Sequence, residues 1–127
     1  MNLEVSNGEL IDKYTILRIK SSKITDSEKL KVVLAELDTL TIPVEMLRIK
    51  YPGIDQAINA LQDVNMTLWD IENAIREKEK SQEFDQAFIN LARSVYFNND
   101  QRAHIKSVIN QNTGTAGEVK QYSDYKA

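Results

Sequence analysis

The sequence predicts an all-α fold of four to five amphipathic helices in an antiparallel helical bundle or helical hairpin array, with one long third helix. Three observations predict it. Apolar residues recur at steps of three and four along most of the chain, which places them on single faces of helices. Only four Gly and two Pro occur, too few for a turn-rich β fold. The 127 residues fit one helical domain at 1–112, followed by a C-terminal loop or tail at 113–127.

The first helix is expected at residues 7–24. Ser6 and Glu9 have the spacing of a capping box, in which each side chain satisfies a backbone N–H at the start of a helix. The apolar residues that follow share one helical face: Leu10, Ile11, Tyr14, Leu17 and Ile24. These signals together predict a helix that packs along this face.

The second helix is expected to begin in the segment Thr25 to Glu28, which repeats the capping-box form. Its predicted buried stripe consists of Leu30, Val33, Leu34, Leu37 and Leu40. We predict that Thr39, Thr41 and Pro43 end it, because Pro disfavours the α conformation of the residue before it. One or two helical turns at 44–51 and a turn at Pro52-Gly53 are expected to lead into the next helix.

The third helix is expected at 54–80, about 40 Å long at 1.5 Å per residue. Its apolar stripe has heptad spacing: Leu61, Val64, Leu68, Ile71 and Ile75. Ser81 is the predicted cap of a fourth helix, whose stripe is Phe84, Phe88, Leu91 and Val95. Asn98-Asn99-Asp100 predicts a break or kink, because Asn tolerates left-handed backbone and Asp caps a new helix. Tyr122 and Tyr125 are the candidate docking residues of the tail.

Charge and composition exclude several classes of protein. The chain has 16 basic and 19 acidic residues, so a dedicated nucleic-acid surface is not expected. Its apolar runs are too short to span a bilayer, and we expect no membrane association. The absence of Cys excludes disulfides and thiolate chemistry and fits a reducing compartment. With no secretory signal at the N-terminus, we predict a cytoplasmic protein.

An unusual polar pattern on the third and fourth helices supplies candidate ligand-binding residues. They are Asn65, Trp69, Glu72, Arg76, Arg93, Tyr96, Asn99, Asp100, Arg102 and Lys106. If these helices pair, Glu72 and Arg93 could form an ion pair, and the rings of Trp69 and Tyr96 could form aromatic walls. The Arg and Lys side chains could bind an anionic group such as a phosphate, helped by free backbone N–H groups at the predicted break. The alternative is structural, with charged side chains flanking an apolar stripe.

No residue pattern predicts catalysis, a metal site or a cofactor. His104 has neither the Glu-x-x-His spacing of a helical metal site nor a nucleophile pattern nearby, so we predict an exposed or capping residue. Glu9 and Asp12 could bind magnesium only with a second acidic pair, and Asp70 and Glu72 diverge on their helix. The helix dipole explains the first-turn acidic residues more simply.

Three blocks of the sequence carry a resemblance to a known family. They are Gly8 to Leu17 with Ile19-Lys20; Val64-Asn65 with Leu68 to Glu72 and Ile75-Arg76; and residues from Phe84 to Ala103, including Leu91-Ala92-Arg93 and Val95-Tyr96. Together they resemble an uncharacterised all-helical domain family of bacteria and bacteriophages, whose members occur alone or fused to glycosyltransferase-like proteins. The resemblance covers nearly the whole chain. It implies no activity and no catalytic residues.

The sequence favours a protein that is not an enzyme: a helical interaction module that self-associates, most simply as a dimer. Long heptad stripes and the lack of a catalytic set favour this hypothesis. The alternative is a binder of, or an enzyme on, a small anionic ligand, either a phosphate or a sugar nucleotide. Its site would lie between the third and fourth helices at the ten candidate ligand-binding residues.

Overall fold

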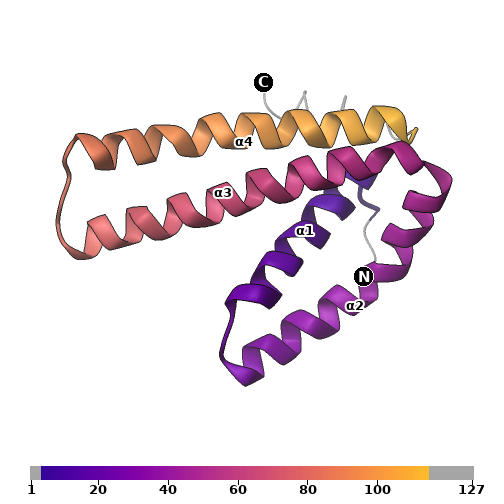
Figure 1. The fold of residues 1–127 in the computed structure, drawn as a ribbon, viewed down its shortest axis with the longest axis horizontal. Coiled ribbons are helices and arrows are strands. Elements are labelled where there is room, and N and C mark those ends of the chain that lie inside the picture. The colour runs from indigo at the N-terminus through magenta and orange to yellow at the C-terminus, as the bar shows by residue number, and fades with distance from the viewer. Residues whose placement is uncertain (1–3, 115–127) are drawn as a thin grey trace.

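The structure, a computed structural model, describes residues 4–114 of the chain. This part folds into four α-helices and one short 3₁₀ helix: α1 (Asn7–Lys23), α2 (Ser27–Lys50), η1 (Pro52–Ile54), α3 (Asp55–Lys80) and α4 (Gln86–Asn112). Figure 1 labels the α-helices. The described part of the chain contains no β-strand. The predicted all-α fold with a long third helix is therefore confirmed. The predicted tail residues Tyr122 and Tyr125 lie outside the described residues.

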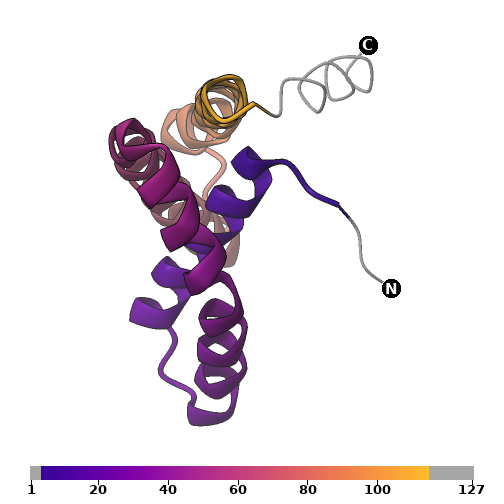
Figure 2. The ribbon, with the colours of Figure 1, turned by 90° about the vertical axis from the view of Figure 1, so that its right-hand side faces the viewer.

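The helices form two antiparallel hairpins that share one end. α1 and α2 make the shorter hairpin, and α3 and α4 make the longer one (Figure 1). α1 packs against α2, α3 and α4, so it joins the two hairpins. From the shared end the hairpins diverge, and Figure 2 shows α1 against the long hairpin with α2 farther away. The fold is thus an array of two hairpins rather than a closed four-helix bundle.

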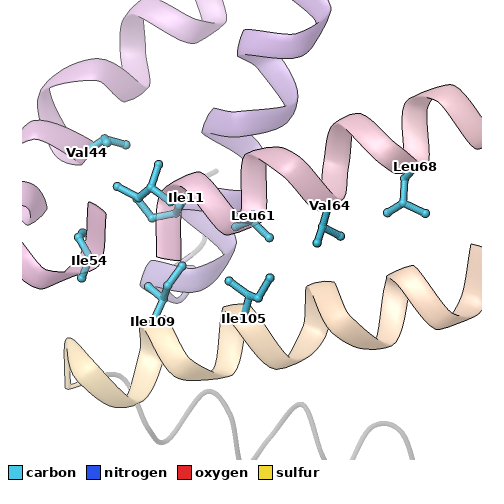
Figure 3. Packing of buried hydrophobic residues seen from close by; sticks show 9 residues of the cluster. Ile11, Val44, Ile54, Leu61, Val64, Leu68, Ile105 and Ile109 are labelled. Carbon is cyan, nitrogen blue, oxygen red and sulfur yellow. The ribbon is translucent and has the colours of Figure 1, made fainter. Parts of the chain in front are cut away.

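The hydrophobic core lies at the shared end, where all five elements meet. Each contributes one nearly inaccessible residue: Ile11 from α1, Val44 from α2, Ile54 from η1, Leu61 from α3 and Ile109 from α4. Figure 3 shows these side chains gathered with three further core residues that it labels, Val64, Leu68 and Ile105. The core therefore fixes α1 on the long hairpin through residues far apart in the sequence.

α1 begins as predicted and lies within a residue of the expected range. The Ser6 hydroxyl accepts a hydrogen bond from the Glu9 N–H at 3.1 Å. α2 begins one residue later than the predicted capping box, because the Asp26 carboxylate accepts from the Lys29 N–H at 3.0 Å. Both starts use an oxygen side chain to satisfy a backbone donor of the first turn.

α2 continues through Pro43, so the predicted end of the helix there is wrong. A Pro inside a helix costs about 3 kcal/mol, because its missing N–H leaves the carbonyl four residues earlier without its usual partner. The following turns bring Val44 into the core and pack Leu47 and Tyr51 against it. Full burial of a side chain the size of Val44 contributes about 1.5–3 kcal/mol. The packing of this segment therefore outweighs the local preference of Pro43 to end the helix.

α4 is continuous, so the predicted break at Asn98 to Asp100 is wrong. The Asn98 side chain donates to the Ser94 carbonyl at 2.8 Å, a bond compatible with an unbroken helix. Its start also differs from the prediction: Asp85, not Ser81, is the N-cap and accepts from the Phe88 N–H at 3.0 Å. The preceding turn contains Gln82, whose φ of 55° is left-handed.

The close packing of α1 against α4 can be tested at Gly8. A Cβ at this position would lie 2.6 Å from the Lys106 carbonyl oxygen and 3.0 Å from the Asn110 Oδ1. We expect Gly8→Ala to lower the free energy of unfolding by about 1–3 kcal/mol, because the two helices must move apart. Urea unfolding followed by circular dichroism measures this loss. The matched control is Gly53→Ala, whose Cβ meets nothing within 4 Å. Equal stability of the two variants would contradict this close packing.

Candidate functional site at the junction of α1, α3 and α4

Asp12 on α1 is a buried carboxylate with partners on two other helices. Its side chain is 4% exposed, and its Oδ1 accepts from Arg102 Nε and from Asn65 Nδ2, each at 2.9 Å. The second oxygen, Oδ2, accepts from Arg102 Nη2. Arg102 therefore holds the carboxylate in the two-pronged geometry that makes Arg–carboxylate pairs strong. Asp12 thus connects α1 to both helices of the long hairpin.

Asn65 and Lys106 extend this network. The Asn65 amide also donates to the Thr15 hydroxyl at 2.9 Å, and the Thr15 hydroxyl donates to the Asp12 carbonyl at 2.8 Å. Lys106 Nζ lies 3.8 Å from Asp12 Oδ2 and also pairs with Glu9. We call Glu9, Asp12, Asn65, Arg102 and Lys106 the junction network. It contains two acidic and two basic residues, so the charges balance.

The electrostatics keep Asp12 ionised at neutral pH. Burial alone would raise the pKa of its carboxyl group, because it disfavours the charged form. The hydrogen bonds from Arg102 and Asn65, with the charges of Arg102 and Lys106, outweigh burial and hold the pKa below its usual value. A carboxylate with both oxygens bound to donors is suited to joining helices rather than to acid–base chemistry. Among residues 4–114, no cluster of three or more His, Cys, Asp or Glu could hold a metal ion.

Sequence reasoning did not identify Asp12 as a junction residue, because it explained the acidic first turn by the helix dipole. A usable signal existed in the spacing. Gly8, Asp12, Thr15 and Ile19 recur at steps of four, three and four, so they share one face of α1. All four are buried. A carboxylate in such a stripe needs a partner on the opposing helix.

The end of α4 holds the first turn of α1 through two more side chains. Asn110 Oδ1 accepts from the Gly8 N–H at 2.7 Å, and Asn7 Nδ2 donates to the Thr113 hydroxyl at 2.9 Å. The Gly8 N–H is one of the donors that a helix leaves without an internal partner at its start. Here a side chain of α4 satisfies it, which fixes α1 along the axis of α4.

Beside the junction network lies a groove of about 290 Å³ between α1, α3 and α4. We call it the junction groove. Its polar lining residues are Lys20, Asn65, Glu72, Arg76, Asn99 and Arg102. Its apolar and aromatic lining residues are Ile16, Ile19, Leu68 and Trp69. Asn65 and Arg102 belong to both the network and the groove, so the network fixes two side chains of the groove wall.

The structure brings six of the ten predicted ligand-binding residues together in this groove: Asn65, Trp69, Glu72, Arg76, Asn99 and Arg102. The contribution of α1, through Lys20 and two isoleucines, was not predicted. Lys106 lies in the junction network instead. Asp100 is exposed on α4 and does not line the groove.

Arg93 and Tyr96 do not line the groove either, and they contact the same ring. The Arg93 guanidinium carbon lies 6.0 Å from the Phe97 ring centroid, and the Tyr96 and Phe97 centroids are 4.5 Å apart. Glu72 pairs with Arg76 at 3.9 Å, and no ion pair joins it to Arg93 in the described residues. The expected Glu72–Arg93 pair is therefore wrong. The free N–H groups expected at Asn99 are absent as well, since α4 is continuous there.

His104 is exposed on α4, as predicted. None of the helices in the described ranges combines the length and apolar character that crossing a bilayer requires.

The fold and the junction define a class of protein: a small all-α protein of two helical hairpins joined by a buried, charge-balanced polar network. A family model described as "Family of unknown function (DUF6165)" matches residues 1–125 of the chain. The chain belongs to this family. No curated protein matches the chain, and no solved structure matches it.

Proposed function

We propose that the protein is a helical interaction module that self-associates through the outer half of the α3–α4 hairpin. We define this outer half as residues 69–104, the part of the hairpin beyond the core. Every buried residue of α3 precedes Trp69, and every buried residue of α4 follows His104. The single observation that carries the proposal is that none of these 36 residues is buried. Two helices without a third layer leave their apolar side chains partly in water.

The segment 84–99 of the outer half has the composition of an interface, whereas α3 and the connection before this segment carry many charges. All three Phe of the chain lie in it, and Phe84 and Phe97 are 52% and 53% exposed. Tyr96 and Ile89 are also exposed, at 53% and 47%. Interface cores are enriched in aromatic residues and Arg and depleted in Lys, Glu and Asp. A solvated helix normally carries more charge than this one: in 86–99 the only charged residue is Arg93.

A second copy of the chain suits this surface because of its charge and its size. The α4 part of the face carries one charge in 14 residues, and residues 69–80 of α3 carry four acidic and three basic residues. Because these charges nearly balance, the face meets its own copy without strong net repulsion, as a two-fold interface requires. Residues 86–104 of α4 extend about 28 Å, and two helices side by side are about 20 Å wide. The resulting face approaches the roughly 600 Å² per partner of the smallest specific interfaces. Pairing two such hairpins would build a four-helix bundle from two incomplete halves.

The experiment is sedimentation velocity on the full chain from micromolar to near-millimolar concentration. We expect the wild type to form a dimer. The double variant Ile89→Glu and Tyr96→Glu should weaken dimerisation by about 100-fold or more, because like charges placed across an interface cost several kcal/mol. Both positions are exposed in the described chain, so the folded monomer should retain its circular dichroism and melting temperature.

The matched control changes two exposed apolar residues on the other hairpin. Ile42 and Met46 of α2 are 70% and 65% exposed, and Ile42→Glu with Met46→Glu adds the same charge. We expect this variant to dimerise like the wild type. If the α2 variant broke the dimer and the α4 variant did not, the interface would lie on the α1–α2 hairpin and the proposal would be wrong. A wild type that stays monomeric over the whole range would disprove self-association.

A further inference from the structure

We infer that the junction groove is a binding site for a small organic phosphate that carries a flat ring, such as a nucleoside monophosphate. The inference goes beyond self-association. Five groove residues lie within 69–104, but the groove lies between this hairpin and α1 and does not include Ile89 or Tyr96. It rests on the side chains that the groove brings together: three basic residues, an indole ring and two amides. α1, α3 and α4 each supply at least one of the basic residues.

The charge of the groove favours an anion although the chain as a whole is acidic. Lys20, Arg76 and Arg102 line it, against Glu72 in the lining and Asp12 beneath it. Lys20 forms no ion pair within residues 4–114. The Arg76–Glu72 pair is long, at 3.9 Å, and both side chains are more than half exposed, so a bound anion can replace it at little cost. Guanidinium and ammonium groups from three helices suit the several oxygens of a phosphate.

Trp69 and the amides suit the organic part of the ligand. The half-buried indole lines the groove beside Ile16 and Leu68, which together offer an apolar wall for a flat ring. The Asn99 amide, which also lines the groove, can donate and accept, as the polar edge of a heterocycle requires. A groove with both an aromatic surface and cationic side chains selects a ligand with both features over inorganic phosphate alone.

The size and the acidic residue limit the ligand further. A volume of about 290 Å³ is near the lower end of small-molecule sites, which excludes a dinucleotide or a polymer enclosed in the groove. Glu72 is the one acidic lining residue, and it would repel a di- or triphosphate more strongly than a monophosphate. The junction network supplies rigidity, because Asp12 fixes Asn65 and Arg102 before any ligand arrives.

The test uses the fluorescence of Trp69, which is the only Trp of the chain and lines the groove. The full chain is titrated with adenosine and uridine monophosphates, with adenosine, and with inorganic phosphate. We expect saturable quenching by at least one nucleotide, no saturation by adenosine, and competition by phosphate without quenching. Binding should persist in the Ile89→Glu, Tyr96→Glu variant, so failure of the proposed dimer would leave this result unchanged.

Matched variants distinguish binding in the groove from a general effect of the protein's positive charges on nucleotide binding. Lys20→Gln and Arg76→Gln should each weaken binding about tenfold, the effect of one charge-assisted hydrogen bond. Arg93→Gln also removes one positive charge from the long hairpin, but outside the groove. It should change the affinity for the nucleotide less than about twofold. Equal weakening by Arg93→Gln would overturn the site. Binding of adenosine as tight as that of its monophosphate, or no saturable change with either nucleotide, would also overturn it.

Discussion

Asp12→Asn is expected to lower the free energy of unfolding by about 3 kcal/mol, and the melting temperature by about 10 °C. The substitution keeps the size of the side chain but removes its charge. The Arg102 and Lys106 side chains are only 29% and 12% exposed, so each would lose an attractive charge in a poorly solvated place. Removal of one partner from a buried pair costs about 3–5 kcal/mol. The partial exposure of Arg102 places the expected loss at the lower end.

The matched control for Asp12 is an exposed pair between α1 and α2, within the shorter hairpin. Lys13 and Glu36 lie 3.0 Å apart with exposed side chains, and Glu36→Gln should cost less than about 1 kcal/mol. Urea unfolding at neutral pH measures both losses. If the two variants were equally stable, the junction network would not be what holds α1 on the long hairpin.

The same carboxylate makes stability depend on pH in a known direction. Because its pKa is lower in the folded than in the unfolded chain, the unfolded state binds more protons and stability rises with pH. The contribution of Asp12 is complete above its ordinary pKa of 3.8 and is lost as the pH falls through the folded value. Asp12→Asn should therefore differ from the wild type at neutral pH and approach it as the pH falls below 3.8. Asp55 and Asp85 also have lowered pKa values, and their effect cancels in this comparison.

The sequence predicted the helices well where local signals and packing agree. The heptad spacing of α3 places Leu61, Val64 and Leu68 on one face, and the structure buries all three. The predictions failed where packing overrides a local signal. Pro43 is a helix breaker by its own chemistry, yet the burial of Val44 holds the helix together across it.

The site could be predicted only in part, for a physical reason. The spacing on α3 and α4 indicated a shared polar face, and six of the ten proposed residues line one groove. The partners of Asp12 lie 53 and 90 residues away, at Asn65 and Arg102, and no helical period connects such positions. The side on which α1 packs decides which polar residues become a groove wall. That choice depends on the core at the shared end, which local spacing does not specify.

The second large effect is expected at Leu61. Its side chain is fully buried, so Leu61→Ala should cost about 2–5 kcal/mol from lost burial and the cavity it leaves. Leu91 in the outer half is only partly buried, and the same substitution there should cost about 1 kcal/mol in the monomer. Thermal unfolding of both variants in dilute solution measures this difference.

Protein concentration then connects this difference to self-association. A second copy over the outer half would add packing around Leu91 but none around Leu61, because the core already encloses Leu61. Since a partner that binds only the folded state stabilises it by mass action, the loss caused by Leu91→Ala should grow with concentration. The loss caused by Leu61→Ala should stay nearly constant as the protein concentration changes. If neither loss varied with concentration, the outer half would face water in the native protein, and the proposed interface would be wrong.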